Sequence, residues 1–593
     1  MKSFLIAVAG TLAGLLLFFI GLPILVVAIA ANSMKPEPAP ARAVIQLDLR
    51  QTISDQGSTE AFDLFQGRTL SVLSVAQTLR EAETDSHVKG LLIRLPEGGL
   101  PPAAADEIGQ AVRHFRTSAK PVIAHSQGVY PSGVAVASYR VGAAADQFWM
   151  QPASSLQAVG IASEDLFLKR LFDKYGVRPD FQQRQEYKNA VNPYLYDDYT
   201  PAHREATLSW MGSVLDSQTA AAAADRKQDP AILKATLAAG PWSAEEAVQK
   251  KLIDRTGQVR EAQAELLRRA GQGAKLLDFA AYRNTLKDRP AEGRPTIAVI
   301  GAEGSIVTGS SDNNGFGRGG NIFSDDLATA FDNASKDKDV KAIVFRVSSP
   351  GGSDTASEQI AAGVRQAKAA GKPVVVSMGT YAASGGYWVS SEASSIVAEP
   401  STLTGSIGVF GGKFALGEAL GRFGVDMREL SVGGDYATAF GPAQPMTDSQ
   451  RAAFAGWMDR IYESFVQRVS TGRKLPVARV REIAKGRVWT GAQAQGLGLV
   501  DKQGGFYEAV DEAKRLGGIA SNQQVRLKRV PGRKSPFEVL QRTLGMSAVS
   551  MKTLAAAAWV LGDPRAQGML DALVESRLRA QGGGMVLAPS PLR

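Results

Sequence analysis

The stretch Tyr381-Ala-Ala-Ser384-Gly-Gly-Tyr387 decides the fold, because a weaker copy of it stands earlier in the chain. Pro400 follows Tyr387 by thirteen residues and opens a Ser-Thr-Leu-Thr-Gly run. Tyr139 likewise stands thirteen residues before Pro152, in a similar Ala-Ser-Ser-Leu context. The position matching Ser384 in this earlier copy is Val136. The chain therefore contains an internal repeat, and its first copy lacks the serine.

The region that follows is also repeated, and here it is the second copy that lacks a residue of the first. Glu186-Tyr-Lys188-Asn-Ala-Val-Asn-Pro193 aligns with Asp435-Tyr-Ala437-Thr-Ala-Phe-Gly-Pro442. Lys188 stands opposite Ala437, so the second copy lacks the lysine. A serine kept in one copy and a lysine kept in the other predict a Ser–Lys dyad assembled across a domain interface.

Further correspondences occur in the same order along both copies. The apolar run 90–95 matches 342–347, and Trp242 and Asp254 are twelve residues apart, as are Trp489 and Asp501. Short apolar strands alternate with helical segments such as residues 357–370 and 448–471. This alternation predicts an α/β fold in each copy, with a largely parallel sheet and right-handed crossovers.

The repeat divides the chain of 593 residues into four parts. We expect a transmembrane anchor at residues 4–31, domains at 43–286 and 296–525, and a basic tail at 526–593. Residues 287–295 are polar and proline-containing, as is typical of a linker. The tail has no counterpart in the first copy beyond residue 528, and it contains two expected helices, at about 536–561 and 563–579.

The first apolar segment indicates in which cellular compartment the protein lies. Phe4 to Ala31 are 28 consecutive residues without a charge, and a helix of that length exceeds a hydrocarbon core of about 30 Å. A cleaved signal peptide is the alternative, because Ala28-Ile-Ala30 has the small-x-small form of a cleavage site. The segment is about twice as long as a usual signal-peptide core, so we expect a retained anchor. Lys2 on its inner side favours a body outside the cytoplasm.

Composition excludes several kinds of chemistry. The chain has no cysteine, which excludes disulfides, thiolate catalysis and cysteine metal sites. The glycine-rich run 309–320 lacks the Gly-Lys-Ser/Thr ending of a phosphate-binding loop, and no paired acidic cluster is typical of a metal site. We expect no cofactor and no metal. All the histidines lie in the first copy, at His87, His114, His125 and His203.

The net charge is unevenly distributed. From Arg526 to the end, eleven Lys and Arg stand against four Asp and Glu, so about +7 of the net charge of +9 lies in the tail. A basic tail on an anchored protein predicts contact with anionic membrane lipid. No aromatic and basic reading platform accompanies the charge, so we expect no nucleic acid partner.

Ser384 is the candidate nucleophile. Small residues on both sides of it permit a tight strand-to-helix turn and the close approach of a substrate backbone. Free N–H groups at the first turn of the following helix would stabilise an oxyanion. A plain glycine turn is the alternative interpretation. Ser348-Ser-Pro-Gly351-Gly352 also follows a strand and predicts a turn that presents another N–H donor, with a purely structural type II turn as its alternative.

Lys188 is the candidate general base. A lysine acts as a base only when it is neutral, so its pKa has to fall from about 10.4 toward about 7 through burial or a nearby cation. Most lysines are solvated surface residues. The alignment of Lys188 with Ala437 of the copy that carries Ser384 favours the catalytic interpretation.

These motifs resemble those of the signal peptide peptidase A family, also called protease IV, in its long duplicated form. The resemblance covers about residues 43–520 and the anchor, and it rests on Ser349-Pro-Gly-Gly352, Tyr381 to Trp388, Pro400 to Gly408 and Tyr187 to Val191. It implies a ClpP/crotonase-like fold in each copy and a Ser–Lys serine protease. It further implies a homotetramer held to the bacterial inner membrane, with its body in the periplasm, that degrades signal peptides left after preprotein processing.

The resemblance also implies residue roles. Ser384 would be the nucleophile, Lys188 the general base and Ser406 the residue that orients the lysine amine. The oxyanion-hole N–H groups would come from Gly385 and from Gly351 or Gly352. Asn192 departs from the glutamate often found before Pro193 in the family, which puts a neighbouring contact in doubt.

Two other functions stay open at the level of sequence. The crotonase fold also hosts acyl-CoA enzymes, although the anchor and the lack of acidic residues near the glycine turns disfavour that chemistry. A non-catalytic membrane scaffold that keeps relics of a dyad is the other alternative. Sequence spacing also leaves open whether Ser384 meets the lysine of its own chain or that of a neighbouring subunit.

Overall fold

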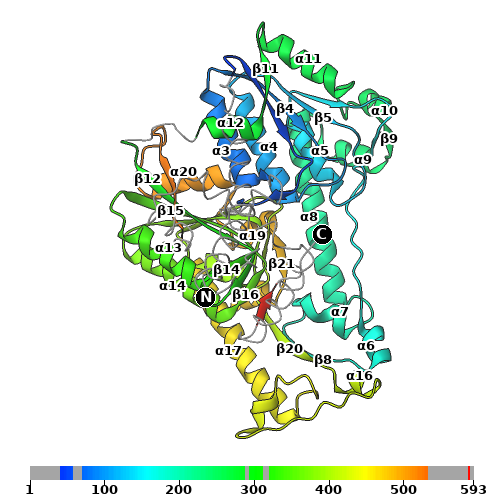
Figure 1. Cartoon of the computed structure of the whole chain (residues 1–593), viewed down its shortest axis with the longest axis vertical. Helices are drawn as coiled ribbons and strands as arrows, with labels where there is room; N and C mark the ends of the chain where they lie inside the picture. Colours follow the sequence, from blue (N-terminus) through cyan, green and yellow to red (C-terminus); the bar gives the residue numbers. More distant parts are fainter. Residues whose placement is uncertain (1–39, 58–69, 287–292, 312–319, 532–584, 588–593) are drawn as a thin grey trace, which may run out of the picture.

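The computed structural model describes residues 40–57, 70–286, 293–311, 320–531 and 585–587. They form two α/β domains that lie against each other (Figure 1). The expected anchor at 4–31 and the expected tail helices at 536–561 and 563–579 lie outside the described residues. None of the helices in the described ranges combines the length and the apolar character needed to span a membrane.

The first domain is built on a parallel sheet of six strands in the order β10-β6-β5-β4-β1-β11. Helices α3, α4 and α5 pack on one face of this sheet, and α11 packs on the other. The strands are β1 (Ala43–Asp48), β4 (Val88–Arg94), β5 (Val122–Ser126), β6 (Gln147–Met150), β10 (Arg255–Thr256) and β11 (Lys275–Asp278). The helices are α3 (Val72–Thr84), α4 (Pro102–Arg116), α5 (Ala135–Ala143) and α11 (Val259–Ala270).

The second domain repeats this plan in six strands of its eight-stranded sheet, which pair in parallel in the order β22-β18-β17-β15-β12-β23. The same sheet also holds β19 (Leu403–Gly405), parallel to β17, and β21 (Val488–Thr490), antiparallel to β19. Helices α13, α14 and α15 cover one face and α20 covers the other. The strands are β12 (Thr296–Glu303), β15 (Val340–Ser349), β17 (Val374–Ala383), β18 (Ser395–Ala398), β22 (Lys502–Gln503) and β23 (Arg526–Arg529). The helices are α13 (Ser324–Lys336), α14 (Asp354–Ala369), α15 (Gly385–Ser391) and α20 (Phe506–Leu516).

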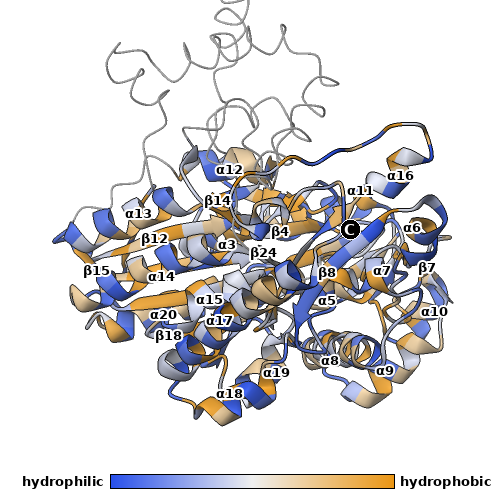
Figure 2. Cartoon of the chain, turned by 90° about the horizontal axis from the view of Figure 1, so that it is seen from below, coloured by the Kyte–Doolittle hydropathy of each residue, from blue (hydrophilic) through white to orange (hydrophobic). Residues whose placement is uncertain are grey.

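The strands form because they are apolar on both faces. In β15 every residue except Lys341 is buried, as expected for a parallel strand covered by helices on both sides. Figure 2 shows strands such as β12 largely in orange, between helices whose outward faces carry blue. The expected parallel α/β fold and the internal repeat are thereby confirmed. Strand β23 lies beyond the expected boundary at 525, so the second domain extends to at least Arg529 and takes the start of the expected tail into its sheet.

An arm of the first domain crosses to the second. Its strand β8 (Arg178–Arg184) pairs antiparallel with β20 (Val409–Ala415), with Arg184 opposite Val409 and Arg178 opposite Ala415. After β8 the chain enters a short 3-10 helix, η3 (Asn189–Val191). The cross-domain strand pair therefore carries Lys188 to the second domain.

Each domain also contributes one long helix. α8 (Pro201–Arg226) and α17 (Asp448–Arg473) have 26 residues each and begin at threonine caps, Thr200 and Thr447. Both end at a lysine in the left-handed region, Lys227 and Lys474, with φ of 55° in each. The repeat thus extends to the backbone angles at the ends of corresponding helices.

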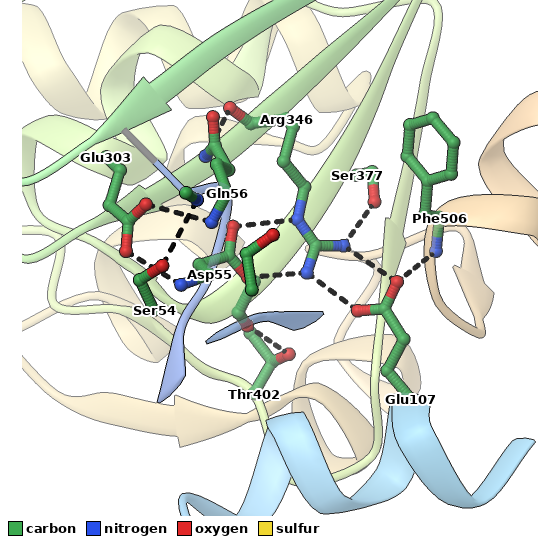
Figure 3. Close-up of polar contacts among 12 residues, drawn as sticks. Ser54, Asp55, Gln56, Glu107, Glu303, Arg346, Ser377, Thr402 and Phe506 are labelled. Carbon is green, nitrogen blue, oxygen red and sulfur yellow. Dashed lines mark hydrogen bonds and ion pairs between the residues drawn. The ribbon is translucent and has the colours of Figure 1, made fainter. Parts of the chain in front are cut away.

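A buried ionic cluster joins the two domains (Figure 3). Arg346 of β15 donates to Asp55 of the first domain at 2.5 and 2.9 Å and to Glu107 of α4 at 2.6 Å. It also donates to Ser377 at 2.9 Å, and Glu107 accepts from the N–H of Phe506. Because these charges are buried, each depends on its partners across the interface.

Candidate active site

Ser384 stands at a sharp turn between β17 and α15. Its φ of 57° and ψ of −120° are unusual for a residue with a side chain, and its N–H donates to the carbonyl of Gly405 at 2.8 Å. A Cβ at Gly385 would lie 2.7 Å from Ser357 Oγ and 3.0 Å from Gly352 N. Glycine is therefore required beside the serine, and the strand-to-helix turn predicted from sequence is present.

Lys188 reaches Ser384 within the same chain. Its Nζ lies 2.8 Å from Ser384 Oγ and 3.0 Å from both the carbonyl oxygen and Oγ of Ser406. In the neutral amine, two N–H bonds can go to the two Ser406 oxygens, which leaves the lone pair for the hydroxyl of Ser384. The structure thus brings together the three side chains predicted for the dyad and its orienting residue.

The environment of Lys188 favours the neutral amine. Ser384, Ser406 and Lys188 are fully buried, and burial holds the pKa of Lys188 well below its usual range. Desolvation disfavours the charged ammonium, which is the direction that a general base requires. Burial therefore shifts the pKa of Lys188 in the direction that the sequence analysis called for.

The segment on the far side of the lysine is equally constrained. Ser406 has a φ of 50° and donates its N–H to the carbonyl of Arg487 at 2.7 Å. Gly486, with φ of 79°, lies so close to Lys188 that a Cβ there would stand 2.6 Å from the lysine Cβ. Sequence reasoning missed Gly486, because a single glycine in Lys485-Gly-Arg487 resembles any loop glycine.

The Gly351-Gly352 segment lies beside the serine, in a different form from the one expected. Instead of only a turn, residues Gly351–Ser353 form a short strand, β16, next to β13 (Ser305–Val307). The N–H of Gly351 donates to Ser349 Oγ at 3.1 Å. Strand β24 (Met585–Leu587), from the C-terminal region, pairs antiparallel with β16. The edge of β16 therefore accepts an extended chain next to Ser384.

The corresponding positions of the repeat hold no second site. Val136 is buried in the first-domain core at the start of α5, and Ala437 is exposed in the 3-10 helix η5 (Asp435–Thr438). Neither side chain has an ionisable or nucleophilic group. The second copy keeps the serine, Ser384, and the first keeps the lysine, Lys188, and the strand pair β8–β20 brings these two together.

Comparisons with known proteins show the family to which this chain belongs. The family model described as peptidase family S49 matches residues 114–273 and 366–520, one segment in each domain. Protease 4 of Salmonella typhi is 34% identical over 508 residues, covering 80% of this chain and 78% of the relative. Protease 4 of Haemophilus influenzae is 33% identical, covering 76% and 73%. The chloroplastic serine protease SPPA of Arabidopsis thaliana is 27% identical, covering 86% and 74%. This chain belongs to peptidase family S49 and is a serine protease.

Proposed function

We propose that this protein is a membrane-anchored endopeptidase that degrades signal peptides remaining after preprotein processing, with Ser384 as nucleophile and Lys188 as general base. The observation that carries the proposal is the buried contact of 2.8 Å between Lys188 Nζ and Ser384 Oγ. Ser406 holds the amine through two further contacts. The substrate class and the anchor rest on the family resemblance and on the apolar residues 4–31.

In the first step, neutral Lys188 takes the proton of Ser384 while Oγ attacks the scissile carbonyl carbon. The N–H groups of Gly385 and Gly352 stabilise the resulting oxyanion. Gly352 is the better candidate of the two neighbouring glycines, because the N–H of Gly351 already donates to Ser349. The ammonium then gives its proton to the leaving amine, which leaves an acyl group on Ser384. Water, deprotonated by Lys188, releases it.

The substrate backbone runs along β16. An extended peptide can hydrogen-bond to the edge of this strand, as β24 does, and main-chain pairing does not depend on side-chain identity. Such pairing suits an enzyme that clears peptides of varied sequence. We also assign the protein to the bacterial inner membrane, as a homotetramer with its body in the periplasm and its basic tail near anionic lipid.

The dyad is tested by comparing Ser384→Ala, Lys188→Ala and Lys188→Arg with a control, Lys174→Ala, that removes an exposed lysine. We expect each dyad variant to lose at least about 10³-fold in peptide cleavage, since removing one member of a catalytic unit disables the whole. Arginine fails as well because it stays protonated. The control should cleave at the wild-type rate.

Covalent labelling separates the alternatives. A fluorophosphonate or peptide aldehyde should form an adduct at Ser384 of the wild type. Full activity in a folded dyad variant would overturn the assignment of the residues. A wild type without adduct or cleavage would favour a scaffold, and tightly bound CoA with turnover of an acyl-CoA would favour crotonase-type chemistry.

A further inference from the structure

The pair β8–β20 has counterparts in the repeat that are unpaired within this chain. Gly176 of the first copy and Gly424 of the second are 248 positions apart, as Tyr139 and Tyr387 are. The counterpart of β20 is therefore residues 161–167 of the first domain, and that of β8 is residues 426–432 of the second. Within the described ranges, neither segment pairs with a strand.

The two arms begin in the same way. Helix α6 (Lys169–Tyr175) leads to Gly176, and helix α16 (Gly417–Gly421) leads through a turn to Gly424. Both glycines have φ of 76°. Residues 426–432 thus leave the second domain from the same backbone geometry that directs β8 away from the first.

Both segments expose apolar side chains. Leu430 and Val432 are 101% and 99% exposed, and Leu166 is 82% exposed. Phe414, the counterpart of Leu166, packs against Phe172 and Phe181, with ring centroids 5.5 and 4.9 Å apart. An unpaired strand edge with exposed apolar residues is a template for another chain. In Figure 1 the chain between β7 (Ser155–Leu156) and α6 runs along the side of the molecule without an adjacent strand.

We propose that residues 426–432 of one copy pair antiparallel with residues 161–167 of a second copy of this chain, in the register of β8–β20. That register sets Val432 opposite Ile161 and Arg428 opposite Asp165. The pairing continues between chains the contact that already joins the two domains within one chain, and it supplies a contact surface for the proposed homo-oligomer.

Charge supports this partner choice. In the observed pair, Lys413 stands opposite Asp180. In the intermolecular pair, Asp165 stands opposite Arg428, so the two side chains again attract each other. The charges have changed places, because the acid now lies on the counterpart of β20 and the base on the counterpart of β8. If β20 paired with residues 426–432 instead, Lys413 would stand opposite Arg428, and if β8 paired with residues 161–167, Asp180 would stand opposite Asp165. Both of these pairs carry like charges, which repel. Like charges thereby direct each strand to its own partner.

The surroundings leave both charges available. Asp165 accepts a hydrogen bond from Tyr199 through one carboxylate oxygen, at 2.8 Å. Arg428 is 80% exposed and reaches Asp426 at 3.1 Å. The proposed contact joins different surfaces of the two copies, so it propagates from chain to chain, as the contacts of a closed ring do. It brings the segment before Ala437 of one copy toward the first domain of the next copy, which has Val136 in place of the serine. The junction between copies therefore carries no Ser–Lys pair.

Cysteine cross-linking tests the register, because the native chain has no cysteine to compete. The full-length double variant Asp165→Cys/Arg428→Cys, oxidised under native conditions, should give covalent dimers and higher species on a non-reducing gel. Two single-cysteine variants and the out-of-register pair Asp165→Cys/Val432→Cys are the controls. They should give at least about tenfold less of the covalently linked dimers and higher species. Equal linking by the out-of-register pair, or no ladder from the in-register pair, overturns the proposal.

Charge reversal tests the same contact without a new covalent bond. Arg428→Asp should shift the protein toward smaller species in sedimentation, and adding Asp165→Arg should restore the larger ones. Arg460→Asp, an exposed reversal on α17, is the matched control. Lack of rescue by the second change contradicts the pairing. Labelling of Ser384 measured in parallel reports on the catalytic assignment, which can fail or stand independently of the strand pairing.

Discussion

At the scale of single residues, the proposed function depends on a lysine that the fold keeps out of water. Lys188 is fully buried with its amine between Ser384 and Ser406. Burial lowers the pKa of Lys188 and so disfavours its ordinary charged form. The proposed general base should therefore reduce the stability of the protein that carries it.

Lys188→Met is expected to stabilise the protein at pH 7. The pKa of Lys188 is lowered in the folded state, so between that pKa and the unfolded value of about 10.4 the unfolded chain binds more protons. Wild-type stability therefore rises with pH in this window, by about 1.4 kcal/mol per pH unit from this group. The advantage of Lys188→Met should shrink between pH 7 and pH 10.

Chemical unfolding at the two pH values measures the difference, with the exposed Lys174→Met as control. The control should show no such trend. A Lys188→Met variant that is less stable than wild type at pH 7, or whose advantage grows toward pH 10, would show that the amine is charged in the folded protein.

At the scale of elements, β16 serves both as part of the candidate site and as the strand with which β24 pairs. It carries Gly351 and Gly352 next to Ser384, and it pairs with β24 on the side where a substrate strand would add. A segment of the chain and a substrate peptide would therefore compete for the same main-chain groups.

Truncation of the chain after residue 584, which removes β24, should lower KM for a peptide substrate severalfold. The physical reason is that the substrate no longer displaces a strand that is held at high effective concentration. Steady-state kinetics on the full-length and truncated proteins measure the effect, with kcat expected to change little. A truncated protein whose KM is unchanged or raised would show that β24 does not compete with substrate.

At the scale of the whole molecule, the site lies between two domains whose docking depends on buried charge. Arg346 of the second domain is held by Asp55 and Glu107 of the first, as Figure 3 shows. Burial raises the pKa of Glu107, although Arg346 opposes the rise. Since Lys188 and Ser384 come from different domains, this cluster and the β8–β20 pair both fix their distance.

Arg346→Met should lower the free energy of unfolding by about 3–5 kcal/mol, because two buried carboxylates lose their cation. Peptidase activity should fall too, as the domains lose alignment. Arg94→Met is the matched control: Arg94 stands at the corresponding place in the first domain, and its guanidinium donates to Gln127 at 3.1 Å.

Denaturant unfolding checks both variants, and the triple change Arg346→Met/Asp55→Asn/Glu107→Gln should recover part of the loss. Equal destabilisation by Arg94→Met and Arg346→Met would mean that the arginine side chain acts by packing rather than by pairing the two acids.

The sequence by itself determined the repeat, the parallel α/β plan and the residues of the candidate site. Ser384, Lys188 and Ser406 lie in local motifs, and a strand made of apolar residues is readable from a short window. The tertiary structure decided that the dyad forms within one chain, through the pairing of β8 with β20. It also decided that Gly486 closes on Lys188, that Arg346 joins the domains, and that β23 belongs to the second sheet. These contacts join residues far apart in sequence, and which of them form depends on how the two domains pack, which no local pattern encodes.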